Sequence, residues 1–500
     1  MSSHPISVRP ERSRGAWRAS RLRSTRTGFC AALLLSGCTV GPNYQPPQIA
    51  IPSNYLEAPA PGEAQLDRWW QGFGDSQLTS LVEQALRQNL DIELAVARIR
   101  EARAQERVAG AGAMPEVAAE ASITRQRISE NAIPVPPGPD GSGSGGGGSF
   151  GLPGSAFTTF RAGFDASWEL DLFGRNRRER EAAAARTGTA VWNRRDAEVS
   201  VAAEVAGAYF RLRTLQEQIG NAEAEFARLQ RYEQLIRAQA KGGLVTGQGL
   251  EQQRSERSAA AAAIPALRAE AKAEIHALGV LTGQAPESLA DPLAAPRALP
   301  PAIAVPPGLP SDLLRRRPDI RSAERDLAAA TADIGVSVAD LYPRISLTAA
   351  PALVSTALGS LLEWGSRSFS AGAALDWPIF DGGRRRANIE VRNARQEQAA
   401  IAYRKAVLTA LQDVEDALGR VDGDRRQLAE LEQARTAALR AEQIAGTRFR
   451  GGLVTLADVL QAQARRLSLE ERMIERRGAL ARDTVALAKA LGGGWQETNQ

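Results

Sequence analysis

Four stretches of the chain alternate between apolar and polar residues with a period of two. One lies within 156–170 and another within 369–377. Each has a partner stretch upstream, beginning near Val117 and near Ile345. Alternation over about ten residues is typical of a strand with one apolar and one polar face. The pattern predicts two β-hairpins, at about 116–170 and about 344–380.

Long helical segments follow the hairpins. From 175 to 241, and again from 384 to 450, the chain has no proline and is rich in Ala, Glu, Arg, Gln and Leu. Such a helix would be about 100 Å long. In the first segment, apolar residues follow the 3-4 spacing of a coiled coil: Leu212, Leu215, Ile219, Ala222, Phe226, Leu229 and Ile236. Shorter helices are expected before each hairpin (78 to about 112; 322 to about 339) and after each long helix (250 to about 281; 457 to about 491).

The two halves of the chain are similar to each other. The motif Gly-Gly-Leu-Val-Thr occurs at 242–246 and again at 451–455, and Trp168 corresponds to Trp377 at the same separation. Equivalent residues upstream of the second strand of each hairpin are farther apart in the sequence than this, which requires an insertion in the first half. A Pro- and Gly-rich tract at 134–148 accounts for it. We interpret the chain as an internal tandem repeat whose copies differ mainly in one loop.

The predicted organisation has six parts. They are a signal peptide (1–37), an extended tether (38–70), a first repeat (71–285), a Pro-rich linker (286–312), a second repeat (313–491) and a tail (492–500). The linker is expected to be extended because of its prolines. Each repeat reverses direction at a turn between its long helix and its return helix, at 242–249 and at 451–456.

The N-terminus has the order of a secretory signal. Seven arginines precede a short apolar core and then Leu35-Ser-Gly-Cys38. This tetrapeptide resembles the lipobox of bacterial lipoproteins, which implies that Cys38 carries S-diacylglycerol and N-palmitoyl groups. The alternative is an ordinary signal peptide with an incidental cysteine. Thr39 lies where an aspartate would favour inner-membrane retention, so the resemblance implies sorting to the outer membrane.

Composition argues against most chemistry. The formal charge of +5 comes from the arginines of the signal, so we expect no nucleic-acid partner. Removal of residues 1–37 as a signal would leave one histidine, His276, and one cysteine, Cys38, so we expect no metal site and no catalytic site built on these residue types. A carboxylate-only site or a bound cofactor stays open. His276 is expected to be a packing or surface residue. The run from Arg175 to Arg178 could bind lipid headgroups or be an ordinary solvated basic patch.

The strands require partners. Each repeat contributes one hairpin, and strands in lipid must close into a barrel because lipid cannot satisfy the N–H and C=O groups of a free edge. Four strands per chain then close in multiples of four. Trp168, Trp377 and Tyr342 lie at one end of the strands and Trp364 near the other, as in an interfacial aromatic girdle. The alternative is a soluble sheet that caps a coiled coil.

The sequence resembles the outer-membrane factor family, the TolC-like exit ducts, and specifically its lipoprotein branch, the NodT subfamily. The matching segments are 35–44, Trp69-Trp70, 167–174, 308–314, 317–324 and 488–495. The resemblance implies a mixed α/β membrane protein that assembles as a homotrimer. Twelve strands would form one outer-membrane barrel, continued through the periplasm by a coiled-coil helical barrel.

The resemblance also implies site residues. The tips that meet a periplasmic adaptor (membrane fusion) protein would be Gly243, Leu244, Val245, Thr246, Gly452, Leu453, Val454 and Thr455. The alternative is that they are only helix-reversal turns. Asp458 and Gln461 are the candidate periplasmic gate, although Asp458 could equally be a first-turn residue favoured by the helix dipole.

We expect a passive export duct rather than an enzyme. The resemblance implies an inner-membrane pump of the RND type as the energy source and small molecules as cargo. The alternative function is a lipid-anchored periplasmic coiled-coil scaffold without a pore.

Overall fold

The computed structural model describes residues 39–56, 66–129, 154–244 and 246–495. They form two compact units. One contains the strands, with Pro115–Arg177 and Ala339–Pro378 together with residues 39 and 40. The other contains almost all of the helical residues. The signal peptide, Cys38 and Val245 lie outside the described residues.

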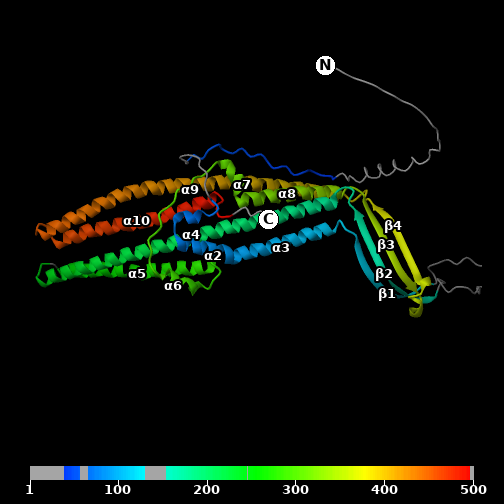
Figure 1. Ribbon diagram of the computed structural model, residues 1–500, viewed down its shortest axis with the longest axis horizontal. Helices are drawn as coiled ribbons and strands as arrows, with labels where there is room; N and C mark the ends of the chain where they lie inside the picture. Colours follow the sequence, from blue (N-terminus) through cyan, green and yellow to red (C-terminus); the bar gives the residue numbers. More distant parts are fainter. Residues whose placement is uncertain (1–38, 57–65, 130–153, 245, 496–500) are drawn as a thin grey trace, which may run out of the picture. The chain divides into compact units, whose positions relative to one another are not determined.

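The first unit is a four-stranded antiparallel sheet (Figure 1). Its strands are β1 (Glu116–Arg127), β2 (Ala156–Leu170), β3 (Arg344–Ser355) and β4 (Arg367–Asp376). They pair in chain order, β1-β2-β3-β4, so the hairpin of the second half continues the hairpin of the first. Within the described chain, β1 and β4 each pair on one side only. The sheet therefore presents two open edges.

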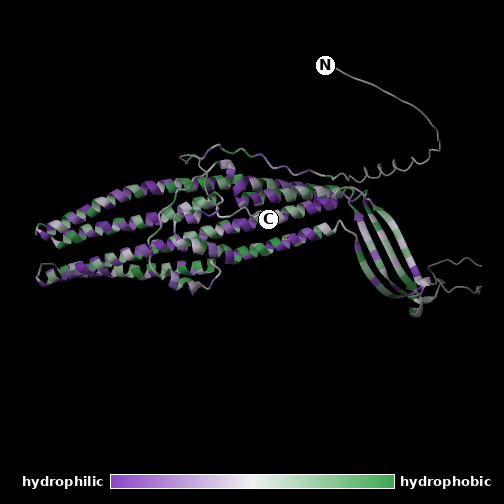
Figure 2. Cartoon of the chain, in the orientation of Figure 1, coloured by the Kyte–Doolittle hydropathy of each residue, from purple (hydrophilic) through white to green (hydrophobic). Residues whose placement is uncertain are grey.

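The register keeps apolar residues on one face of the sheet. Ala121 lies opposite Ala162, which lies opposite Leu353 on the next strand. The same face is strongly exposed within one chain, with Ile123 71%, Phe164 58% and Phe369 85% accessible. The alternation of hydropathy along the strands is visible in Figure 2. The face that would form a core in a soluble sheet is bare here.

Two long antiparallel helix pairs dominate the second unit (Figure 1). The first is α4 (Arg175–Lys241) with α5 (Gly247–Leu281), and the second is α9 (Arg384–Arg450) with α10 (Leu456–Ala490). The long helices have 67 residues each and the return helices 35 each. No helix in the described part of the chain is long and apolar enough to cross a membrane. The two helix pairs thus have the same lengths in the two halves.

An ion pair recurs at equivalent places in the two helix pairs. Arg257 on α5 contacts Glu233 on α4 at 2.9 Å, and Arg466 on α10 contacts Glu442 on α9 at 2.6 Å. Both glutamates lie about two turns before the end of their long helix. In each helix pair the ion pair therefore joins the two helices close to the turn between them. The sequence comparison had not singled out these residues.

The helix expected before the first hairpin is interrupted. It consists of α2 (Ser76–Gln88) and α3 (Leu90–Ala111), separated at Asn89. The Asn89 side chain accepts hydrogen bonds from the N–H groups of Asp91 and Ile92, and it donates one to the carbonyl of Leu281. Asn89 therefore caps α3, and the expectation of one continuous helix was wrong. In the second half, α8 (Pro318–Ala339) is continuous.

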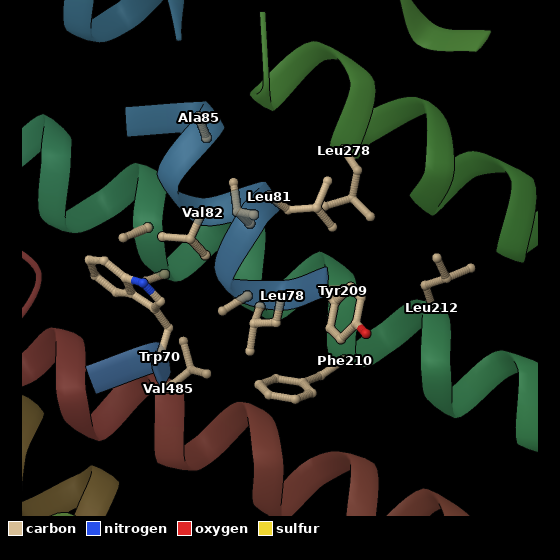
Figure 3. Packing of buried hydrophobic residues seen from close by; sticks show 14 of the residues in the cluster. Trp70, Leu78, Leu81, Val82, Ala85, Tyr209, Phe210, Leu212, Leu278 and Val485 are labelled. Atoms are coloured by element: carbon tan, nitrogen blue, oxygen red, sulfur yellow. The ribbon is translucent and has the colours of Figure 1, made fainter. Parts of the chain in front are cut away.

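The main core lies where α2 packs against α4, α5 and α10 (Figure 3). It includes Leu78 and Val82 from α2, Phe210 from α4, Leu278 from α5 and Val485 from α10. All are less than 5% exposed. A second cluster, around Tyr403, Val407 and Leu487, serves the second half. Through these two cores, the shorter helices pack against the long helices.

The sequence suggested an extended Pro-rich linker, but the structure shows that the linker is only partly extended. Its first part contains η2 (Pro286–Leu289) and α6 (Ala290–Ala294), and its end contains η3 (Pro310–Asp312), followed by α7 (Leu313–Arg316). Leu289 and Leu293 are buried in the main core. Burial of these two leucines favours the short helical turns, because residues four apart on consecutive helical turns lie on the same side, here the core side.

Candidate functional site

The turn at the end of α4 is a Schellman motif. The N–H of Leu244 donates to the carbonyl of Gln239 (2.9 Å), and the N–H of Gly243 donates to that of Ala240 (3.0 Å). Gly243 has φ +71°, a conformation that favours glycine. The local sequence therefore stops the helix here without help from the rest of the chain.

The turn at the end of α9 has the same geometry. Leu453 donates to Arg448 and Gly452 donates to Phe449, both at 2.9 Å, and Gly452 has φ +69°. Figure 1 shows both turns at the same end of the helical unit. The predicted tip residues of the two repeats are therefore brought to one end of the fold.

The leucine of each turn is exposed. Leu244 is 79% and Leu453 71% accessible. The glycines are explained by the reversal of the chain, but an exposed leucine gains little from packing within the chain. Val454 is half-buried. Among the tip residues that the structure describes, the two leucines are therefore the large apolar side chains exposed to a partner.

The helices that leave the two turns begin differently. Thr246 accepts a hydrogen bond from the N–H of Gly249 at 3.4 Å. Thr455 takes part in a full capping box with Asp458. Since Gly249 occupies the position equivalent to Asp458, the first turn lacks the carboxylate that completes the box. The two tips therefore have the same chain-reversing turn but differ in how completely the following helix is capped.

Both candidate gate residues lie on the exposed surface of α10. The carboxylate of Asp458 accepts hydrogen bonds from the hydroxyl and the N–H of Thr455, and these bonds lower the pKa of Asp458 below its ordinary value. Gln461 lies one turn further on. The structure thus gives Asp458 a capping role, the alternative that the sequence had left open, while its charge stays exposed to solvent.

Polar contacts join the two helix pairs above the tips. The buried guanidinium of Arg228 on α4 donates to the carbonyl of Leu460 on α10 at 3.3 Å. Asn221 donates to the carbonyl of Leu467 and to the carboxylate of Glu471. Sequence reasoning missed these contacts because they join residues from different repeats.

The residues that follow Cys38 are docked at the end of β2. The N–H of Val40 donates to the carbonyl of Phe173 (3.2 Å), and Arg177 donates to the hydroxyl of Thr39 (2.7 Å). Gly174 has φ +79°, and a Cβ there would lie 2.8 Å from Thr39 Cγ2. Glycine is therefore needed at 174 for two reasons, its conformation and the close approach of Thr39.

The basic run at 175–178 makes internal contacts. Arg178 is buried, and it donates to the carbonyl of Gly41 (3.2 Å) and to the side chain of Asn43 (2.7 Å). Arg175 pairs with Asp340 at 3.2 Å. Both earlier interpretations, lipid headgroup binding and a solvated patch, were therefore wrong for Arg178, which holds the tether instead.

Other candidate chemistry is sparse in the described part of the chain. No group of three His, Cys, Asp or Glu side chains there could hold a metal ion. His276 is exposed on α5. The tips, the gate candidates and the docked N-terminal segment are therefore the features from which a function can be argued.

Comparison with known proteins identifies the class. The family model of the outer membrane efflux protein matches residues 81–284 and 309–493. The pyoverdine export outer membrane protein OpmQ of Pseudomonas aeruginosa is 33% identical over 478 residues, covering 94% of this chain and 97% of that protein. Nodulation protein T of Rhizobium leguminosarum bv. viciae is 30% identical, covering 93% and 92%.

Solved structures agree with the sequence comparison. The outer-membrane channel OprN has a TM-score of 0.81 at 33% identity, covering 92% of this chain and all of that one. The open state of the MtrE channel of Neisseria gonorrhoeae has a TM-score of 0.78 at 27% identity, covering 93% and 100%. The chain belongs to the outer membrane efflux protein family. It is an outer-membrane exit duct of an efflux system and extends into the periplasm.

Proposed function

We propose that three copies of this chain form one continuous passive duct, with a twelve-stranded barrel in the outer membrane. The observation that carries this proposal is the sheet, which has two open edges and one bare apolar face. An open edge in lipid would leave several N–H and C=O groups unsatisfied. Pairing β4 of one copy with β1 of the next satisfies them, and the apolar face then meets the lipid.

The helices also support self-assembly. On α9, Val391, Ile401 and Leu408 are 47%, 60% and 52% exposed, and on α3 Leu90 and Val108 are 65% and 74% exposed. Ile401 and Leu408 are one heptad apart, the spacing of a coiled-coil contact. A neighbouring copy would cover these positions, so the helical barrel would close together with the strand barrel.

The exposed tips suit an adaptor. Each chain offers Leu244 and Leu453 at one end of its helical unit, so a trimer offers six exposed leucines. Helical hairpins bind through apolar residues inserted into grooves. We propose that a periplasmic adaptor with such hairpins contacts Gly243–Thr246 and Gly452–Thr455, and links the duct to an RND-type inner-membrane pump.

Asp458 and Gln461 are our candidates for the periplasmic gate. Both are exposed on α10 close to the second turn. In a trimer each would occur three times at one level, and the hydrogen bonds from Thr455 keep Asp458 ionised. A ring of carboxylates at a narrow entrance would attract cations.

The docked tether supports a lipid anchor at Cys38. Thr39 and Val40 are held beside Phe173 and Gly174, at the end of β2. An acylated Cys38, one residue earlier, would insert its chains into the leaflet next to that end of the strands. We therefore place this end at the periplasmic leaflet and the β1–β2 and β3–β4 loops outside the cell.

Planar-bilayer recording tests the proposal. Purified trimers should give discrete, gated openings. A scaffold without a pore would give no conductance in the same bilayers, and that result would contradict the proposed duct.

A further inference from the structure

Charged residues are sorted between the two faces of the sheet. The acidic residues of the strands all lie on the polar face: Glu116, Glu120, Asp165, Glu169 and Asp376. On the apolar face the charged residues of the strands are all arginines, namely Arg125, Arg127 and Arg367. The apolar face is therefore purely basic wherever it is charged.

The three arginines also share one end of the sheet. Arg125 lies opposite Thr158 and Arg127 opposite Ala156, the first residue of β2. Arg367 is the first residue of β4 and lies opposite Leu353. The other end of the sheet joins the helices. Since the proposed function places that end at the periplasmic leaflet, the arginines lie at the outer leaflet, and this inference rests on that placement.

Arg367 is held at this end by an exposed aromatic residue. Its Nε donates to the carbonyl of Trp364 (2.9 Å), and its guanidinium group lies over the Trp364 ring. Trp364 is 78% exposed. An interfacial tryptophan beside an arginine is typical of the headgroup level of a membrane. Arg125 and Arg367 have no acidic partner among the described residues.

Closure of the barrel would bring the arginines together. They lie on the two edge strands, Arg125 and Arg127 on β1 and Arg367 on β4. When β4 of one copy pairs with β1 of the next, all three residues meet at one junction, on the face that contacts lipid. A trimer would have three such junctions.

We propose that this arginine cluster binds the phosphate groups of a phosphorylated lipid in the outer leaflet. A guanidinium group binds phosphate through two parallel hydrogen bonds and keeps its charge at any physiological pH. The cluster lies on the lipid-facing surface, where a soluble acidic protein has no access. A phosphorylated headgroup bound there would contact two protomers and so strengthen the trimer.

Lipid retention tests the proposal. Wild-type trimers would be placed in nanodiscs that contain phosphatidylcholine and a bis-phosphorylated glycolipid, and the lipids that stay bound would be counted by native mass spectrometry. The variant R125Q/R127Q/R367Q should retain at most about one tenth of the glycolipid that wild type retains. Arg161→Gln, which removes an arginine from the polar face of the same sheet, should retain as much as wild type.

Two outcomes would overturn the proposal, and two further results show which claim has failed. Equal retention by the triple variant and wild type would overturn the proposal, and so would equal retention of the dephosphorylated glycolipid by wild type. If the triple variant still forms conducting trimers, the failure concerns the arginine cluster alone. If wild type forms neither trimers nor pores, the proposed function fails first.

Discussion

The carboxylate of Asp458 accepts a hydrogen bond from the backbone N–H of Thr455 at 2.8 Å and another from its hydroxyl group at 2.7 Å. The equivalent position in the first repeat is Gly249, which offers no such acceptor. The two helix starts at the tip should therefore respond differently to pH, although the turns before them are alike.

The first prediction concerns this pH response. The hydrogen bonds lower the pKa of Asp458, so its stabilisation of the helix start is full above the ordinary Asp range and is lost as pH falls through the lowered pKa. Amide hydrogen exchange in the first turn of α10 should accelerate below about pH 4, after correction for the intrinsic rate. The first turn of α5 serves as the internal control. Asp458→Asn should remove the pH response, and an unchanged response in that variant would show that another group titrates.

The second prediction concerns the tips. Leu244→Asp with Leu453→Asp should weaken contact with the adaptor, while trimers persist because both side chains are exposed. Photocrosslinking from residue 454 in cells would measure the contact, and export of a pump substrate would measure the consequence. Leu244→Met with Leu453→Met is the matched control. Full export by the double aspartate variant would refute the tip assignment.

The third prediction concerns the docked N-terminal segment. Gly174→Ala would place a Cβ 2.8 Å from Thr39 Cγ2 at a residue with φ +79°. The segment should detach, and limited proteolysis near residue 40 should become faster. The control is Gly207→Ala in α4, where a Cβ has open space; it should be neutral or stabilise the helix by about 1 kcal/mol. Equal proteolysis of the two variants would mean that Gly174 does not hold the segment.

The fourth prediction concerns lipidation. Cys38→Ser removes the only thiol that a lipobox at 35–38 could use, so incorporation of radioactive palmitate should cease. The trimer should still form, because the strands and helices supply its contacts. Palmitate labelling that survives in Cys38→Ser would place the lipid elsewhere or show that the signal is an ordinary one.

Local patterns determined most of the elements. Alternation located all four strands, and the absence of proline located α4 and α9, because these signals depend on residues close together in the chain. The break at Asn89 was missed, although Asn before Asp91 is a local helix-start signal. The hydrogen bond that Asn89 donates to Leu281, far away in sequence, could not be predicted. The role of Arg178 was missed for the same reason, because its partners are Gly41 and Asn43.

Sequence reasoning about the tips had a similar limit. The repeated motif indicated the turns, and the Schellman geometry follows from the glycines at 243 and 452. In the sequence, the two helix starts differ in having Gly249 in one repeat and Asp458 in the other. The structure shows the consequence of this difference, because only the helix start with Asp458 has a capping box.

The central claim is that one face of the sheet meets lipid and the other lines a water-filled duct. Phe164 and Asp165 are adjacent on β2 and lie on opposite faces. The chain has two cysteines, Cys30 and Cys38. Cleavage of the proposed signal would remove Cys30 and acylation would block Cys38, so a fluorophore can be attached at a single new cysteine at either position. In proteoliposomes, we expect a fluorophore at 164 to be quenched by spin-labelled lipid and one at 165 by aqueous iodide. Quenching of both positions by iodide alone would contradict the account.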